Sequence, residues 1–156
     1  MKHRSIIISK TVKILILACA VLVVFGLVIW DAPRNRLELF LEKSVIEETA
    51  RNYLTAEMKK DSRQVYALLA PSSDYKKTHT YEEYLKDIAE NSSAALNTCK
   101  IVRIYHLRDN HNRHNYPAVD KLVQVEVEVT FGHAGPNSIF NYSFTFLKEK
   151  GKWYKG

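Results

Sequence analysis

An uninterrupted apolar segment near the amino terminus constrains this chain more than any other feature. Residues 14–30 read ILILACAVLVVFGLVIW, which is seventeen residues without a charged side chain. As a helix that rises about 1.5 Å per residue, the segment would be about 26 Å long, close to the hydrocarbon thickness of a bilayer. We therefore expect a single transmembrane helix at 14–30, preceded by a short tail at 1–13 and followed by a juxtamembrane linker or helix extension at 31–43.

Two processed forms of this segment are the alternatives to an uncleaved anchor. Residues 18–20 have the small side chains of a signal cleavage site, and Cys19 is also the residue that a lipoprotein signal would modify, although the bulky Leu17 fits that signal poorly. The apolar run continues through 21–30, so a protein cleaved here would still begin with a membrane segment. The prediction is an uncleaved anchor, in which Cys19 is a small apolar residue within lipid.

The charges around the segment predict its orientation. Four of the 23 Lys and Arg residues precede position 14, ahead of every acidic residue, whereas the following flank mixes both signs. A short tail with four cations favours a cytoplasmic amino terminus and an extracytoplasmic domain on the far side of the cytoplasmic (inner) membrane. The exported part then holds the other 19 basic residues against 17 acidic ones. Because this balance is nearly even, we expect no nucleic-acid binding.

The first half of the predicted domain, 44–156, has helical patterns. Ser44 with Glu47 matches a capping box at the start of a helix, and apolar residues then recur at helical spacing on one face. These residues are Ile46, Ala50, Tyr53, Leu54 and Met58. Apolar residues within 37–41 continue the stripe toward the membrane, so an earlier helix start is the alternative.

Two shorter helices follow. One is expected at 63–69 and ends before Pro71, because the residue before a proline avoids the helical conformation. The other opens with Thr80 and Glu83, which match a second capping box. Both carry apolar residues on one face and are expected to pack on the same core.

The second half has the alternation of β-strands. In 122–131 one face is apolar, and residues 139–147 repeat the pattern. A strand with looser alternation is expected at 99–107, a short last strand at 153–154, and a turn between the two long strands at 135–137. Helices followed by an antiparallel meander with one apolar face predict an α+β domain, with the helices packed on one side of the sheet.

The order of these elements resembles the nuclear transport factor 2-like superfamily, which has a cystatin-like fold. The resemblance covers 45–156 and rests on short motifs at 50–61, 65–71, 80–85 and 146–154, the last being FLKEKGKWY. It implies a curved antiparallel sheet wrapped around amino-terminal helices, a cone-like α+β barrel. The chain is most similar in organisation to membrane-anchored bacterial members of unknown function. Because the superfamily includes enzymes, small-molecule binders and assembly modules, the resemblance does not select a function.

Candidate site residues come from the two faces of the predicted sheet. On the side of the helices we expect an apolar cavity lined by Tyr53, Tyr66, Val125, Val127, Tyr142 and Phe144. On the opposite side, the residues offered to a partner are Gln124, Glu126, Glu128 and Thr130. Enzymes that resemble this fold place an acid or base at the bottom of the cavity. The strand face assigned to the cavity carries no carboxylate, so no catalytic residue and no enzyme activity are predicted.

The histidines are the other candidates for chemistry. His106, His111 and His114 lie close together, but residues 108–117 are polar and turn-like, and such a loop seldom preorganises metal ligands. We expect no metal and no cofactor, and we expect His106, if it points inward, to be a core histidine. Cys99 is expected to be a buried thiol in a strand.

These observations predict a single-pass, membrane-anchored, non-enzymatic binding or assembly module of the cell envelope. It would pair with itself or with another envelope protein. Two alternatives remain. The first is a carrier of a small apolar ligand in the cavity between helices and sheet. The second is an enzyme of the same fold, which requires an ionisable residue facing the cavity.

Overall fold

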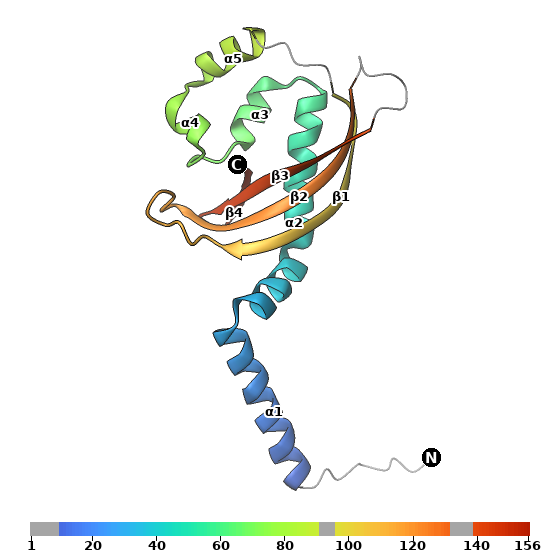
Figure 1. Cartoon of the computed structure of the whole chain (residues 1–156), viewed down its shortest axis with the longest axis vertical. Helices are drawn as coiled ribbons and strands as arrows, with labels where there is room; N and C mark the ends of the chain where they lie inside the picture. The colour runs from blue at the N-terminus through green and yellow to red at the C-terminus, as the bar shows by residue number, and fades with distance from the viewer. Residues whose placement is uncertain (1–9, 91–95, 132–138) are drawn as a thin grey trace, which may run out of the picture.

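The structure is a computed structural model that describes residues 10–90, 96–131 and 139–156. Predictions made for the tail residues 1–9 and for the turn at 135–137 lie outside the described residues. Over the described ranges the chain forms a series of helices followed by a series of strands (Figure 1). The α+β class is confirmed.

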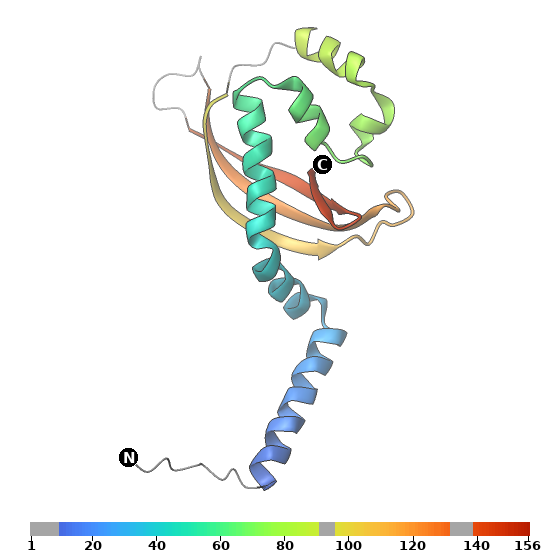
Figure 2. The same cartoon turned by 180° about the vertical axis from the view of Figure 1, so that it is seen from behind.

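The helices are α1 (Lys10–Ile29), α2 (Asp31–Met58), α3 (Ser62–Leu68), α4 (Asp74–Thr78) and α5 (Tyr81–Glu90). The strands are β1 (Leu96–Asp109), β2 (Val119–Phe131), β3 (Phe140–Glu149) and β4 (Lys152–Lys155). They form one antiparallel sheet in the order β1-β2-β3-β4. The sheet curves around α2, with α3 to α5 grouped near the carboxyl end of α2 and α1 extending away from its amino end (Figures 1 and 2).

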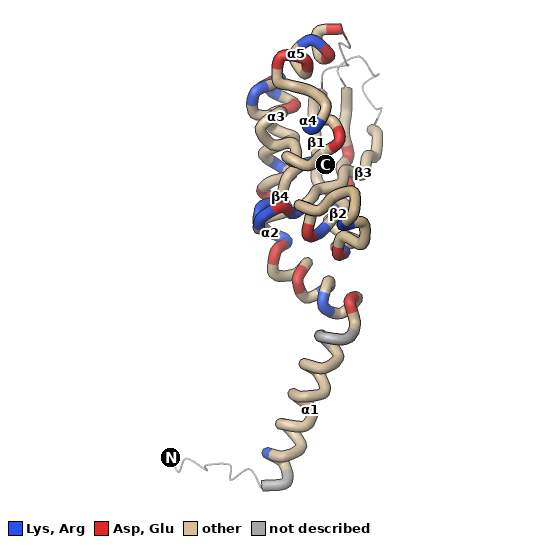
Figure 3. The backbone as a smooth tube through the Cα atoms, turned by 90° about the vertical axis from the view of Figure 1, so that its left-hand side faces the viewer, with Lys and Arg blue, Asp and Glu red and all other residues tan. Residues whose placement is uncertain are grey.

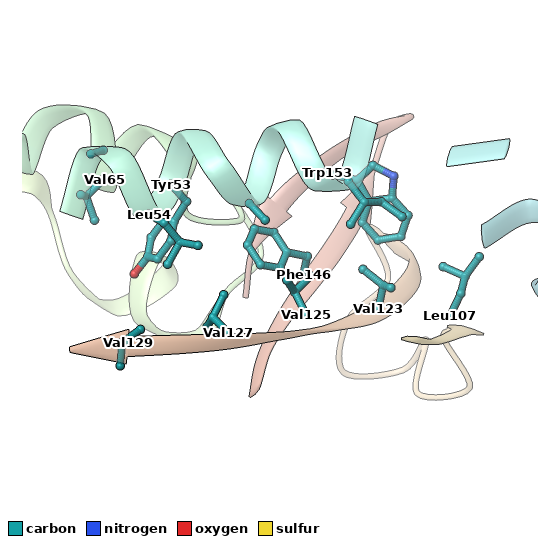
Figure 4. Close-up of a cluster of buried hydrophobic side chains, with 13 residues drawn as sticks. Tyr53, Leu54, Val65, Leu107, Val123, Val125, Val127, Val129, Phe146 and Trp153 are labelled. Carbon is teal, nitrogen blue, oxygen red and sulfur yellow. The ribbon is translucent and has the colours of Figure 1, made fainter. Parts of the chain in front are cut away.

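The core lies between α2 and the inner face of the sheet. Alternate residues of β2 form the centre of this face, as the pattern predicted, and Val123, Val125 and Val127 are fully buried. They face Phe146 and the residues of α2 in one continuous layer (Figure 4). Burying each such side chain stabilises the fold by about 1.5–3 kcal/mol. The predicted inward stripe of α2 is likewise confirmed, since Ile46 and Ala50 are completely buried.

The start of α2 differs from the capping-box prediction. The helix begins at Asp31, and Ser44 is an exposed residue in its interior. Glu47 instead accepts a hydrogen bond from Arg51 Nη2 at 2.7 Å, one turn further along the helix. Pro33 does not interrupt the helix because it lies in the first turn, where a missing backbone N–H costs nothing. Residues 31–43 therefore form the first part of α2.

The capping box at Thr80 is confirmed. The Glu83 N–H donates to Thr80 Oγ1 at 3.3 Å, and the Thr80 N–H donates to Glu83 Oε2 at 2.7 Å. The helix α4 was not predicted. It is short, and Ser73 caps it by accepting a hydrogen bond from the Lys76 N–H at 3.3 Å.

Strand β1 is less regular than the sequence suggests. Its pairing with β2 shifts register between Ile101 and Arg103 and again after Tyr105. Such irregularities change which residues face the core, so Val102 is 45% exposed. His106 is exposed and has a φ of 54°. It is therefore not a core histidine.

The segment predicted to cross a membrane forms most of α1. Its described part from Ile14 to Gly26 carries no charge, whereas charges are frequent along α2 (Figure 3). In the described ranges, no single helix is both long and apolar enough to cross a bilayer. The segments Val12–Gly26 and Asp31–Met58 meet these two criteria only when they are taken as a pair, and a sharp bend separates them. Membrane crossing by 14–30 thus stays a prediction.

Candidate functional site

A cavity of about 580 Å³ lies between the helices and the sheet, at the carboxyl end of α2 and far from α1. This volume is within the range of small-molecule sites. Helix α2 and the turn after it contribute Tyr53, Leu54, Glu57 and Lys60. The following helices contribute Ser62, Val65, Tyr84 and Ile88. The sheet contributes Leu96, Val129, Phe131, Tyr142 and Phe144.

The cavity wall contains one carboxylate, Glu57, among its described residues. The Tyr53 hydroxyl donates a hydrogen bond to Glu57 Oε1 at 2.6 Å, because the two residues are one helical turn apart on the same face of α2. Burial first, and then the charge of Glu57, raises the pKa of Tyr53 far above its usual range. Tyr53 therefore stays a neutral donor. Oxygen Oε2 of Glu57 has no hydrogen-bond partner in the described part of the chain.

Aromatic rings form much of the remaining wall. Tyr142 stacks on Phe144 with ring centroids 6.3 Å apart, and Phe131 meets Tyr142 edge-on at 6.2 Å. Across the cavity, burial and then the charge of Glu57 raise the pKa of Tyr84 to about 12. Figure 4 shows Tyr53 and Val129 at the same end of the core, and both residues border the cavity. Such a surface suits an apolar, planar ligand.

A lysine lies on the other side of this aromatic wall. Lys155 Nζ is 5.9 Å from the ring centroid of Tyr53 and 5.5 Å from that of Phe144. Burial lowers the pKa of Lys155, and the charge of Glu57 partly opposes this effect. The cation lies against the faces of these two rings.

Three of the six residues predicted to line a cavity do line it, namely Tyr53, Tyr142 and Phe144. Val125 and Val127 are instead completely buried in the core, because α2 covers the middle of the sheet. The residues of α2 that line the open space lie between Tyr53 and Glu57, near the end of the helix.

Tyr66 does not line the cavity; it packs against Tyr81 and against Tyr84 of the cavity wall, at centroid distances of 5.3 and 5.4 Å. Glu57 was missed because carboxylates were sought only on the strand face of the predicted cavity. A signal was present, since Glu57 follows Tyr53 by four positions and so shares its face of the helix. Glu57 is an ionisable residue of the kind that the enzyme alternative requires.

The outer face of the sheet carries the residues predicted to meet a partner, Gln124, Glu126, Glu128 and Thr130. Their polar groups are paired within the sheet. Arg103 Nε donates to Glu126, and Lys100 Nζ lies 3.8 Å from Glu128 Oε2. These are cross-strand pairs between exposed basic side chains and partly exposed carboxylates, so each contributes little to stability. Their use as a partner face stays a prediction.

The metal-ligand candidates are not brought together. Across 10–90, 96–131 and 139–156, no group of three or more His, Cys, Asp or Glu side chains is placed to hold a metal ion. Cys99 is half-buried, with its Sγ 3.7 Å from Met58 Sδ, and burial raises the pKa of its thiol. The expected absence of metals and cofactors stays a prediction.

Comparisons with known proteins give no further guide. A scan of the sequence against protein-family models finds no match, and a search of curated proteins finds none either.

Proposed function

We propose that this chain is a membrane-tethered domain that binds a small, mainly apolar ligand in the cavity at the end of α2. The observation that carries the proposal is the open cavity of about 580 Å³, whose wall is aliphatic and aromatic except for a few polar groups. A ligand with one hydrogen-bond donor would place that donor on Glu57 Oε2. Its apolar body would lie against Phe131, Tyr142 and Phe144.

The binding energy would come from two sources. Apolar surface removed from water contributes about 25 cal/mol per Å². A hydrogen bond to a charged carboxylate contributes about 1.5–3 kcal/mol. The Tyr53 hydroxyl holds Glu57 in place before the ligand arrives, so little side-chain freedom is lost on binding.

The tether in this proposal is α1. Its apolar side chains are exposed along the described part, as Leu15 (64%) and Leu22 (71%) illustrate. Surface of this kind is stable only when lipid or another protein covers it. The cations before position 14 support an inside amino terminus, with the domain on the extracytoplasmic side of the cytoplasmic membrane.

Assignment to the nuclear transport factor 2-like superfamily is part of the same proposal. It is supported by the order of elements, in which helices precede a curved four-stranded antiparallel sheet. We favour ligand binding over assembly through the outer face, because the carboxylates of that face are already paired.

We also favour binding over catalysis. A carboxylate held by Tyr53 is sufficient to orient a ligand, whereas catalysis also requires a reacting bond placed beside it. Conversion of a bound ligand by the wild-type chain, lost in Glu57→Gln, would establish the enzyme alternative instead.

The test uses the full chain in phosphatidylcholine nanodiscs and 1-naphthylamine, an aromatic amine, as a fluorescent probe. Empty nanodiscs provide the background. Ser62→Trp fills the cavity from the start of α3, where Ser62 is only half-buried. Gln64→Trp is the matched control, because Gln64 is exposed in the same helix.

We expect saturable binding to the wild-type chain, loss of binding in Ser62→Trp and unchanged binding in Gln64→Trp. Glu57→Gln should weaken binding about 10- to 100-fold, the equivalent of the lost charge-assisted hydrogen bond. The cavity is refuted as the ligand site if a folded Ser62→Trp variant binds 1-naphthylamine as tightly as the wild-type chain does. It is also refuted if the wild-type chain shows no saturable binding.

A further inference from the structure

The first half of α2 carries an apolar patch that the domain does not cover. It consists of Leu37, Phe40, Leu41 and Val45, which are 47, 77, 67 and 52% exposed. We call these four residues the α2 patch. The exposed face of the same helix changes character beyond them, with Glu48 and Arg51 in place of apolar residues. The patch is thus confined to the end of α2 that adjoins α1.

Ion pairs on the opposite side of the helix hold the patch outward. Lys121 Nζ binds Glu38, and Lys148 Nζ binds Glu42. Trp153 Nε1 also donates to Glu42 Oε2, at 2.7 Å. These partners belong to strands β2, β3 and β4, so the sheet occupies one side of the helix. At 100° per residue the patch then faces away from the sheet.

The same ion pairs turn the carboxylates near the patch toward the sheet and leave two cations exposed. The carboxylates of Glu38 and Glu42 are turned toward the lysines of the sheet and neutralised. Arg36 and Lys43 are exposed, and no ion pair joins either of them to another described residue. The surface beside the patch is therefore cationic.

We propose that an anionic lipid surface covers the α2 patch, so that the first half of α2 lies in the headgroup region. The inference rests on the proposed insertion of α1. Three observations carry it. The patch lies near the start of the helix that follows α1, it combines apolar side chains with unpaired cations, and the same exposed face becomes charged at Glu48 and Arg51. This is the composition of helices that lie in a membrane interface.

A second copy of the chain fits this surface less well. A symmetric dimer through the patch would bring Arg36 and Lys43 of both copies together, and like charges at an interface oppose association. Lipid contact would also orient the domain. Glu57 lies twelve residues beyond Val45, so the cavity would be about 18 Å further along the helix from the headgroups.

The experiment measures the depth of a nitroxide label in the full chain, reconstituted in vesicles of phosphatidylcholine with phosphatidylglycerol. Cys19 and Cys99 are first replaced by alanine. Ser44→Cys then places the label one turn from Phe40, in the middle of the exposed face, without removing a patch residue. Arg51→Cys is the matched control, two turns further along the same face. A label on native Cys19, with Cys99 replaced, reports insertion of α1.

We expect the label at position 44 to collide several-fold less with a water-soluble nickel chelate, and more with oxygen, than the label at position 51. The difference should shrink with Arg36→Glu and Lys43→Glu, or in vesicles of phosphatidylcholine alone.

Equal nickel accessibility at positions 44 and 51, with Cys19 in lipid, would overturn the inference but leave the tether intact. Spin–spin broadening between labels at position 44 would overturn it in favour of a second copy. A water-exposed label at Cys19 would refute both the tether and this inference, whereas 1-naphthylamine binding tests the cavity independently.

Discussion

Replacing Glu42 by alanine tests whether polar contacts between α2 and the sheet stabilise the domain. Oxygen Oε1 of Glu42 accepts from Lys148 Nζ, and Oε2 accepts from Trp153 Nε1 at 2.7 Å. Trp153 is only 4% exposed, so its indole N–H would lose its acceptor at a largely buried position. Lys148 would keep one carboxylate, Glu38, whose Oε1 is 3.7 Å from Nζ.

The magnitude follows from these contacts. A hydrogen bond to a charged group contributes about 1.5–3 kcal/mol, and a buried donor without a partner costs about 1–3 kcal/mol. The two effects overlap, because both involve the same carboxylate, so we expect Glu42→Ala to lower the free energy of unfolding by about 2–4 kcal/mol. For a domain of this size the Tm should fall by roughly 10 °C. Glu42→Gln keeps an acceptor for the indole N–H, so its free energy of unfolding should fall by about half as much as that of Glu42→Ala.

The assay is thermal and urea unfolding of the full chain in detergent, followed by near-ultraviolet circular dichroism, to which the packed Trp153 ring contributes. Glu48→Ala is the control, because Glu48 is exposed on the same helix and its loss should change stability by less than about 0.5 kcal/mol. If Glu42→Ala and Glu48→Ala unfold at the same temperature and urea concentration, the polar contacts contribute no net stability. The argument that these contacts hold α2 in its orientation then fails.

Three further predictions concern pH, a turn and a helix cap. Burial alone would raise the pKa of Asp109, but Lys121 and Arg34 lower it below its usual value. The stability that this gives is present at neutral pH and is lost as the pH falls below about 5. In urea unfolding between pH 7 and 3, the stability of Asp109→Asn should therefore depend less on pH than that of the wild-type chain. Gly151 has a φ of 78°, and no described atom lies within 4 Å of an added Cβ. Gly151→Ala should therefore lower the free energy of unfolding only by the backbone strain, about 1–2 kcal/mol in urea unfolding. An unchanged free energy of unfolding would refute the left-handed turn. Thr80→Ala should cost about 1 kcal/mol and speed amide exchange in the first turn of α5, and unchanged exchange would contradict the cap.

Local patterns determined the elements of the fold. The alternation in 122–131 and the repeat of apolar residues from Ile46 to Leu54 each depend only on the geometry of one strand or one helix, so they predicted the buried faces correctly. The capping box at Thr80 was predictable for the same reason, since both of its hydrogen bonds join residues three positions apart. At Ser44 the same local signal failed, because contacts with the sheet and good helical residues extend α2 in the amino-terminal direction.

The arrangement of the site depended on contacts between distant segments. Whether a core residue of the sheet also borders the cavity depends on where α2 ends. Val129 and Val127 have the same place in the alternation and are both buried, but only Val129 borders the cavity among the described residues. The role of Glu57 depends on how far the helix extends past the sheet. By itself, the sequence determined an apolar amino-terminal segment, the helical and extended elements after it, and the face that each one buries, because these follow from local periodicity. Only the tertiary structure decided that the cavity is open, that a carboxylate lines it and that the α2 patch faces outward, because these follow from packing between residues far apart in the chain.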